Sequence, residues 1–225
     1  MQFSFPVGVA VMSSLMSTRL VIAIVLPVVL WSVQSGARAQ TPAPVAGCIA
    51  GPAALAPSQL SPRGITNFGQ VTPTLFRGGQ PTSEGYRELK QMGIDTVISF
   101  RHEKGENTLE RRAVEGLGMR FVSLPWHAWE DPTDQQVSQF FALLTSSPHS
   151  KVYVHCQQGR DRTGTMVALY RVGVDHWCPA SAVAEMRAYH YHHFWFPQLE
   201  TYVENFPQRL AKDQSLATAI SAAQH

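Results

Sequence analysis

Apolar residues along the chain follow two alternating spacings, and this alternation predicts strands separated by helices. Runs rich in β-branched and aromatic residues predict strands at residues 74–77, 94–100, 119–124 and 151–155. Apolar positions three and four apart predict helices at residues 83–92, 107–117, 133–144 and 163–174, and Pro179 and Pro197 mark the starts of two more. Strands that alternate with helices pair in parallel. We therefore expect an α/β fold with a central, mainly parallel sheet of four to five strands, flanked by helices on both faces.

The N-terminal segment carries an uninterrupted apolar run of 12 residues, from Leu20 to Trp31. A helix that crosses a membrane needs about 20 apolar residues, so this run is too short to span one. Arg19 precedes the run and the small-x-small triplet of residues 37–39 follows it, which is typical of a secretory signal peptide over residues 1–39. An uncleaved anchor is the alternative. We expect export to the periplasm or the medium, with no stable membrane span in the mature chain.

Composition divides the rest of the chain into three parts. Residues 40–66 are rich in Ala, Pro, Gly and Ser and show no period, which is typical of a flexible linker. The periodic signals begin near residue 67 and end near residue 211, so we expect one folded domain over residues 67–211. Residues 212–225 are expected to form a loosely held C-terminal tail.

The charge and composition exclude several classes of protein. Lys and Arg number 18 against 16 Asp and Glu, which gives a formal net charge of +2 and no sign of the basic surface of a nucleic-acid binder. With 44% hydrophobic residues, the chain is neither intrinsically disordered nor a fibre. We expect a globular domain with no nucleic-acid partner, and the sequence leaves its oligomeric state open.

Cysteine usage leaves more than one arrangement open. The chain has three cysteines, Cys48, Cys156 and Cys178, which are too few for a disulfide framework. In an oxidising compartment a Cys48–Cys178 disulfide would leave Cys156 free, and three free thiols are the alternative. Residues 45–48 also look like a lipoprotein box, so a lipid anchor on Cys48 is a further alternative, although the box lies well beyond the apolar run.

One loop carries the residues expected to do chemistry. The strand predicted to end at His155 is followed by CQQGRDRTG, residues 156–164, which leads into a helix. In an open parallel sheet, ligands bind at the carboxyl ends of the strands. A loop in that place turns successive backbone N–H groups toward one point, and with the positive end of the helix they form a cradle for an anion. The candidate substrate-binding residues are Gln157, Gln158, Gly159, Arg160 and Asp161.

This cradle favours phosphoryl transfer through a cysteine. Cys156 would lie at the bottom of a positively polarised bowl, where we expect the thiolate to dominate at neutral pH. Arg162 carries a planar fork that can bind two phosphate oxygens and stabilise charge in the transition state. We expect His155 to orient the loop and the Thr163 hydroxyl to bond the sulfur, easing its departure when water hydrolyses the phospho-cysteine. The chemistry needs no metal and no organic cofactor.

The sequence HCQQGRDRTG, residues 155–164, resembles the signature of the cysteine-dependent protein tyrosine phosphatases. Its short spacing and the segment FRGGQPTSEGYRELKQMGIDTVISFR, residues 76–101, are similar to compact bacterial members of the dual-specificity branch. The resemblance covers about residues 67–210 and implies that the folded domain is a phosphatase catalytic domain. The low-molecular-weight phosphatases place a related loop at the N-terminus, so its late position here disfavours them.

The resemblance also implies a general acid, usually an Asp on a loop upstream of the cysteine, and here the match weakens. The usual Asp position falls near Ala128. Asp131 is the first candidate on that loop, Glu130 the second and His127 the third, whereas Asp134 is expected to cap a helix. If none of them reaches the leaving group, we expect a preference for leaving groups that need little protonation.

Three further groups of residues have both a structural and a functional interpretation. The histidines within residues 190–193 lack the i, i+4 pair of a helical metal site, which favours a packed aromatic helix end over a metal site. Residues 101–104 follow a predicted strand and either contact substrate or form a solvated turn. Trp126 and Trp129 either wall a pocket for an aromatic or sugar-like ring or anchor their loop.

These expectations lead to three hypotheses about function. The first is a phosphatase that acts on phosphotyrosine, and also on phosphoserine or phosphothreonine, in a protein or a small phosphorylated substrate. The second is hydrolysis of an inositol phosphate or phosphoinositide, for which relatives often carry extra bases in the loop. Here Arg160 is the single extra base and Asp161 offsets its charge. The third is a pseudophosphatase that binds phosphate without turnover, against which Cys156, Arg162 and Thr163 all argue.

Overall fold

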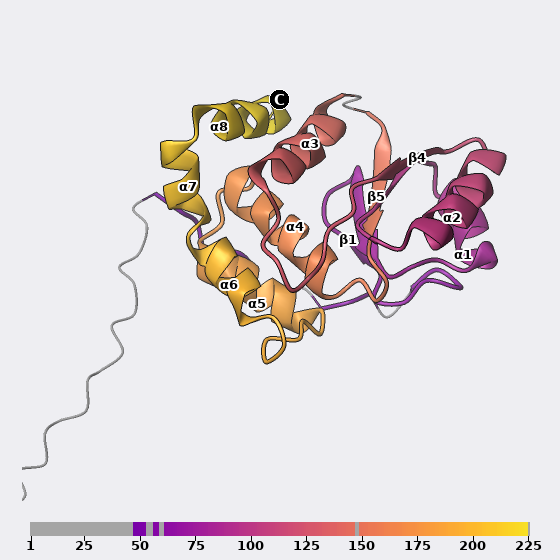
Figure 1. The fold of residues 1–225 in the computed structure, drawn as a ribbon, viewed down its shortest axis with the longest axis horizontal. Coiled ribbons are helices and arrows are strands. Elements are labelled where there is room, and N and C mark those ends of the chain that lie inside the picture. The colour runs from indigo at the N-terminus through magenta and orange to yellow at the C-terminus, as the bar shows by residue number, and fades with distance from the viewer. Residues whose placement is uncertain (1–46, 53–55, 59–60, 147–148, 225) are drawn as a thin grey trace, which may run out of the picture. The chain divides into compact units, whose positions relative to one another are not determined.

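The computed structural model of the chain describes residues 47–52, 56–58, 61–146 and 149–224 (Figure 1). The predicted signal peptide and the first part of the predicted linker lie outside these residues. In the part that is described, no helix is both long and apolar enough to cross a membrane.

The centre of the fold is a five-stranded sheet in which all strands but one run parallel. The strands are β1 (Gly69–Gln70), β2 (Leu75–Gly78), β3 (Ile94–Ser99), β4 (Arg120–Ser123) and β5 (Lys151–His155). Their order across the sheet is β1-β2-β5-β3-β4, and only β1 pairs in the antiparallel direction. Strand β5, which Cys156 follows, is therefore central. The expected mainly parallel sheet is confirmed.

Helices cover both faces of the sheet, as Figure 1 shows. They are α1 (Ser83–Gln91), α2 (Lys104–Gly116), α3 (Asp134–Thr145), α4 (Asp161–Gly173), α5 (Pro179–Ala188), α6 (Pro197–Glu204), α7 (Phe206–Lys212) and α8 (Gln214–Ser221), followed by a 3-10 turn, Ala222–Gln224. Local signals fix several of their starts. Thr82 caps α1, and Thr133 caps α3 in a reciprocal capping box with Gln136, so Asp134 is the first residue of that helix and not its cap.

Alternation along the strands divides the hydrophobic interior into two clusters. On β5, Val152 and Val154 face the cluster under α3 to α8, whereas Tyr153 faces the cluster under α1 and α2. On β3, Ile98 and Val97 divide in the same way. Both faces of the central strands are thus buried, which explains why each strand contains consecutive apolar residues, at 97–98 and 152–154.

The boundaries expected from composition need correction at both ends of the domain. The expected tail contains α8, whose Leu216 and Ile220 are buried against the core, and Asp213 caps the helix with its carboxylate. Toward the other end, Cys48 forms a disulfide with Cys178, which ties part of the expected linker to the residue that precedes α5. The sequence left this pairing open. Since the disulfide occupies the Cys48 sulfur, that sulfur has no free valence for a thioether to a lipid.

Candidate active site

The loop between β5 and α4 has the shape that its sequence predicts. Cys156 is the free cysteine of the described residues and is 3% exposed at the end of β5. Gly159 has a φ of +69°, and a Cβ built there would lie 2.3 Å from the carbonyl carbon of Gly78. Only glycine fits this turn. The first N–H groups of α4, which begins at Asp161, have no acceptor within the helix and are available to an anion.

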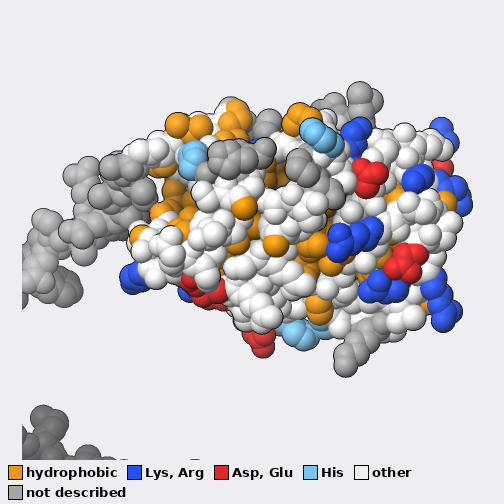
Figure 2. Space-filling model, turned by 90° about the horizontal axis from the view of Figure 1, so that it is seen from above, with side chains coloured by type: hydrophobic (Ala, Val, Ile, Leu, Met, Phe, Trp, Pro, Cys, Tyr) orange, Lys and Arg blue, Asp and Glu red, His pale blue; other side chains and the backbone are white. Residues whose placement is uncertain are grey.

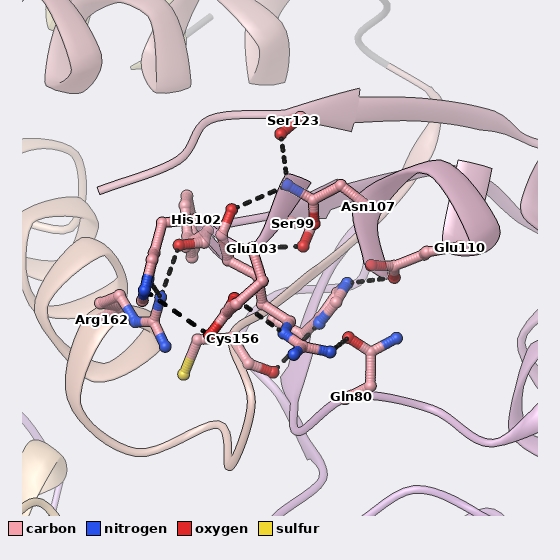
Figure 3. A network of polar contacts seen from close by, with 12 residues as sticks. Gln80, Ser99, His102, Glu103, Asn107, Glu110, Ser123, Cys156 and Arg162 are labelled. Carbon is pink, nitrogen blue, oxygen red and sulfur yellow. Dashed lines mark hydrogen bonds and ion pairs between the residues drawn. The ribbon is translucent and has the colours of Figure 1, made fainter. Parts of the chain in front are cut away.

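Arg162 turns its guanidinium into the protein, and its side chain closes over the same cavity as Cys156 (Figure 3). Nη1 donates to the carbonyl oxygens of Phe100, at 3.0 Å, and Trp126, at 3.3 Å. It also donates to Nδ1 of His102 at 3.2 Å, so that nitrogen carries a lone pair and the ring is neutral. Arg162 is 8% exposed. The guanidinium is therefore held in place before any ligand binds.

His155 is fully buried beside the carboxylate of Glu110. Its Nδ1 lies 3.1 Å from the carbonyl oxygen of Cys156, and its Nε2 lies 2.7 Å from Oε1 of Glu110. The ring thus lies between two oxygen acceptors, at ion-pair distance from the carboxylate. Burial opposes the charge on Glu110, but the neighbouring His155 and the hydrogen bonds outweigh it and lower the pKa of Glu110.

The sequence analysis did not single out Glu110, which is 5% exposed on α2. It accepts a second hydrogen bond from the Tyr86 hydroxyl at 2.8 Å, and Tyr86 in turn contacts the amide of Gln80. A signal was present in the sequence. Val114, four residues after Glu110, is buried on the face of α2 that packs against the core, and a carboxylate on such a face needs a partner.

Residues 101–104 do not act as one group. Arg101 is 7% exposed and donates to Oε1 of Gln80, at 3.0 Å, and to Glu103, at 3.3 Å, and thereby joins these two residues, which Figure 3 labels. His102 lines the cavity, and Lys104 is the first residue of α2. Burial first, with the nearby charges of Arg162 and Arg101, lowers the pKa of His102 against the opposing effect of Glu103.

Thr163 is fully buried at the start of α4. Its hydroxyl has no hydrogen-bond partner among the described residues. The predicted bond to the Cys156 sulfur is therefore not formed in this structure, and the hydroxyl is free to make it.

The structure separates the candidates for the general acid. His127 lines the cavity together with Cys156 and Arg162, whereas neither Asp131 nor Glu130 is among the residues that line it. Asp131 is influenced instead by Arg209, and burial raises the pKa of its carboxyl against that effect. The structure thus brings the third candidate to the nucleophile and not the first two.

The cavity has a volume of about 430 Å³ and an aromatic mouth. Trp129 packs against Phe196 with ring centroids 4.7 Å apart and against Trp195 at 6.4 Å. Trp129 and Trp195 are each 65% exposed and line the cavity, whereas Trp126 is 4% exposed. Trp129 therefore forms a wall, and Trp126 anchors the loop and offers its carbonyl to Arg162.

His192 lines the cavity and is held by residues of the loop. Its backbone N–H donates to Asp161 at 2.9 Å, its Nδ1 lies 3.0 Å from the same carboxylate, and its Nε2 lies 3.0 Å from Nη1 of Arg160. Because a guanidinium only donates, His192 is neutral with its proton on Nδ1. Among the described residues, no group of three or more His, Cys, Asp or Glu side chains is placed to hold a metal ion.

Fold and site together are those expected of the cysteine-dependent phosphatase class, and comparison with known proteins assigns the family. The family described as "PTP-NADK: DSP-PTPase phosphatase fused to NAD+ Kinase" matches residues 63–201. This match covers more than half of the chain, so the chain belongs to this family of dual-specificity-like protein tyrosine phosphatases.

Individual relatives agree with this assignment. The chain is 31% identical over 121 residues to the dual specificity protein phosphatase TpbA of Pseudomonas aeruginosa, covering 54% of this chain and 53% of TpbA. It is 30% identical over 124 residues to human dual specificity protein phosphatase 26, covering 52% and 57% of the two chains. The chain thus spans about half the length of the curated relatives it matches.

A solved structure supports the fold. The crystal structure of P. aeruginosa TpbA in complex with pTyr is similar with a TM-score of 0.59 and 24% identity, and the match covers 73% of this chain and 94% of that one.

Proposed function

We propose that this chain hydrolyses phosphomonoesters through a phospho-cysteine, acting as a protein tyrosine or dual-specificity phosphatase. One observation carries the proposal. The guanidinium of Arg162 is fixed by three acceptors at the wall of the cavity that also holds the free Cys156, at the amino end of α4. A phosphate in this cavity meets a nucleophile, a bidentate donor and a set of amides at once.

Each reacting group then has a role. The Cys156 sulfur attacks phosphorus while the ester oxygen leaves, and Arg162 with the loop amides stabilises the charge on the equatorial oxygens. His155 orients the loop through its contact with the Cys156 carbonyl, and Glu110 holds the His155 ring in place. Water then attacks phosphorus, and the free hydroxyl of Thr163 donates to the departing sulfur.

The shape of the cavity favours an aromatic leaving group such as phosphotyrosine over an inositol polyphosphate. Trp129, Trp195 and Phe196 give the mouth of the cavity flat apolar walls, which suit a ring. Arg160, the single extra base of the loop, contacts His192 and lines a different cavity, so it does not supply a second phosphate site beside Cys156. The TpbA structure that holds pTyr has a similar fold, which agrees with this preference.

A burst experiment tests the proposal. Rapid mixing of the purified chain with p-nitrophenyl phosphate should release about one equivalent of nitrophenol per Cys156 when hydrolysis of the phospho-enzyme is the slower step. Cys156→Ser should retain binding of phosphotyrosine peptide and lose all turnover. If the wild-type chain turns over no aryl phosphate but binds the peptide, the pseudophosphatase hypothesis replaces this one. Faster phosphate release from inositol polyphosphates than from phosphotyrosine peptide at equal concentration would favour the second hypothesis.

We also propose that the chain is exported after removal of residues 1–39. The Cys48–Cys178 disulfide supports this, since disulfides persist in oxidising compartments and are rare in the cytosol. N-terminal sequencing of the chain recovered from a periplasmic extract should begin at Gln40. A chain that remains cytosolic with both thiols free to alkylation would contradict the proposal.

A further inference from the structure

The cavity gathers an unusual number of imidazoles around one cysteine. His102, His127 and His192 all line it, together with the carboxylate of Asp161. The family's usual carboxylic acid is absent from its expected place, which Ala128 occupies. The proton that the leaving oxygen needs must therefore come from one of these four groups or from solvent.

Two of the imidazoles are already engaged in hydrogen bonds within the protein. Nδ1 of His102 accepts from Arg162 and Nε2 of His192 accepts from Arg160, so neither of these nitrogens has a proton to give. Asp161 accepts from the backbone N–H and from Nδ1 of His192, which holds it as a carboxylate. The remaining nitrogen of His102, Nε2, carries the proton of the neutral ring and lies 3.7 Å from the carboxylate of Glu103, which attracts that proton.

His127 is uncommitted. Among the described residues its side chain makes no hydrogen bond, and the residue is exposed at the wall of the cavity. Its ring lies against that of His102, with centroids 3.8 Å apart. Two imidazoles this close do not both ionise readily, because each charge disfavours the other.

The surroundings of the two rings differ. Burial lowers the pKa of His102, and the nearby charges of Arg162 and Arg101 add to this effect, whereas Glu103, at 3.7 Å, opposes it. His127 is the exposed ring of the pair and lines the cavity. His127 is therefore the ring of the pair that is better placed to pass a proton into the cavity.

We propose that His127 is the general acid of this enzyme, with His102 as the neutral ring against which it stacks; the inference rests on the function proposed above. In the first step the S–P bond forms, the P–O bond breaks, and the proton of the His127 imidazolium passes to the leaving oxygen. In the second step neutral His127 takes a proton from water, the water oxygen bonds to phosphorus, and the S–P bond breaks. The imidazolium is thereby restored.

The dependence of rate on the leaving group tests this assignment. We would compare kcat/KM for phenyl phosphate and for p-nitrophenyl phosphate in wild type, His127→Asn, Asp131→Asn and His149→Asn. His149 is an exposed histidine on the segment between α3 and β5 and serves as the matched control. His127→Asn should lower the rate with phenyl phosphate by about 100-fold or more, because phenolate needs a proton to leave. With p-nitrophenyl phosphate the loss should be within about fivefold.

Each other outcome has a defined meaning. An equal loss with both substrates, or no loss, would overturn the assignment, and thermal melting would then show whether folding is the cause. If Asp131→Asn shows the leaving-group dependence instead, Asp131 is the general acid. A wild-type chain that hydrolyses neither substrate would refute the proposed function itself. As a second readout, the fall in wild-type rate as pH rises through the range where imidazoles titrate should be absent in His127→Asn.

Discussion

Glu110→Gln is the substitution that tests the buried network most directly. The carboxylate is 5% exposed, lies 2.7 Å from Nε2 of His155 and accepts from the Tyr86 hydroxyl at 2.8 Å. Glutamine keeps the shape and an oxygen acceptor but removes the charge. The substitution therefore exchanges a charge-assisted contact for a neutral one, which should cost about 1 kcal/mol in the free energy of unfolding.

The pH dependence of this loss follows from the pKa of Glu110. The pKa is lower in the folded state than in the unfolded chain, so the carboxylate contributes its full stabilisation above the unfolded value. That stabilisation disappears as pH falls through the folded value. The difference between wild type and Glu110→Gln should therefore be complete at about pH 6.5 and shrink below about pH 4, near the ordinary value for glutamate.

Urea unfolding followed by circular dichroism at both pH values measures this difference. Glu115→Gln is the matched control, because Glu115 lies on the same helix and forms an exposed i, i+4 pair with Arg111 at 3.0 Å. It should cost less than about 0.5 kcal/mol. A loss for Glu110→Gln as small as that of the control, or one that is the same at both pH values, would refute the stabilising contact assigned to Glu110 and His155. Activity should also fall, since His155 loses the carboxylate that holds its ring behind the loop.

Three other substitutions test separate features of the fold. Gly159→Ala should cost about 1–3 kcal/mol and lower activity, since φ is +69° and the new Cβ would meet the backbone of Gly78; thermal melting with a rate assay measures both. Replacing Cys48 and Cys178 together by Ser should cost about 2–5 kcal/mol in urea unfolding, because the bridge joins residues 130 apart. Leu216→Ala should lower the free energy of unfolding by about 2–5 kcal/mol if α8 packs on the core. An unchanged urea midpoint would instead support the expectation of a loosely held tail.

The nucleophile loop could be predicted because its determinants are contiguous. A β-branched strand, a glycine at a left-handed turn and a helix start follow one another within residues 151–164, and each acts on its immediate neighbours. The strands of the sheet were predictable for the same reason, since burial on both faces leaves a continuous apolar run. β1 was missed because two residues carry no period.

The C-terminal part was misjudged because its helices are short. α7 and α8 have seven and eight residues, and neither would be stable without the surface on which it packs. The signal was present but weak: Asp213 is a good N-cap, and Leu216 and Ile220 lie four apart. The pairing of Cys48 with Cys178 could not be predicted either. The two residues are 130 apart in the sequence, and only the complete fold brings them together.

The general acid could not be identified from its position in the sequence. Asp131 was ranked first because it precedes a proline on the correct loop, yet it does not line the cavity, and its charged neighbour is Arg209, which pairs with Asp134 at 2.5 Å. His127 and His102 belong to loops after different strands, and nothing local indicates that their rings stack. Contacts of this kind follow from the sheet order, not from either segment.

The parallel sheet also explains why the sequence motif alone predicts that the Arg162 guanidinium points into the protein. The residues that follow β2, β3, β4 and β5 meet at one edge, where they supply Gln80, Phe100, Trp126 and Cys156 in turn. Two of the three acceptors that hold the guanidinium are backbone carbonyls, those of Phe100 and Trp126. A side-chain substitution at either position leaves the carbonyl in place. The orientation of Arg162 therefore depends on strand order more than on the identity of its neighbours, whereas the proton donor depends on a side chain and is free to differ between relatives.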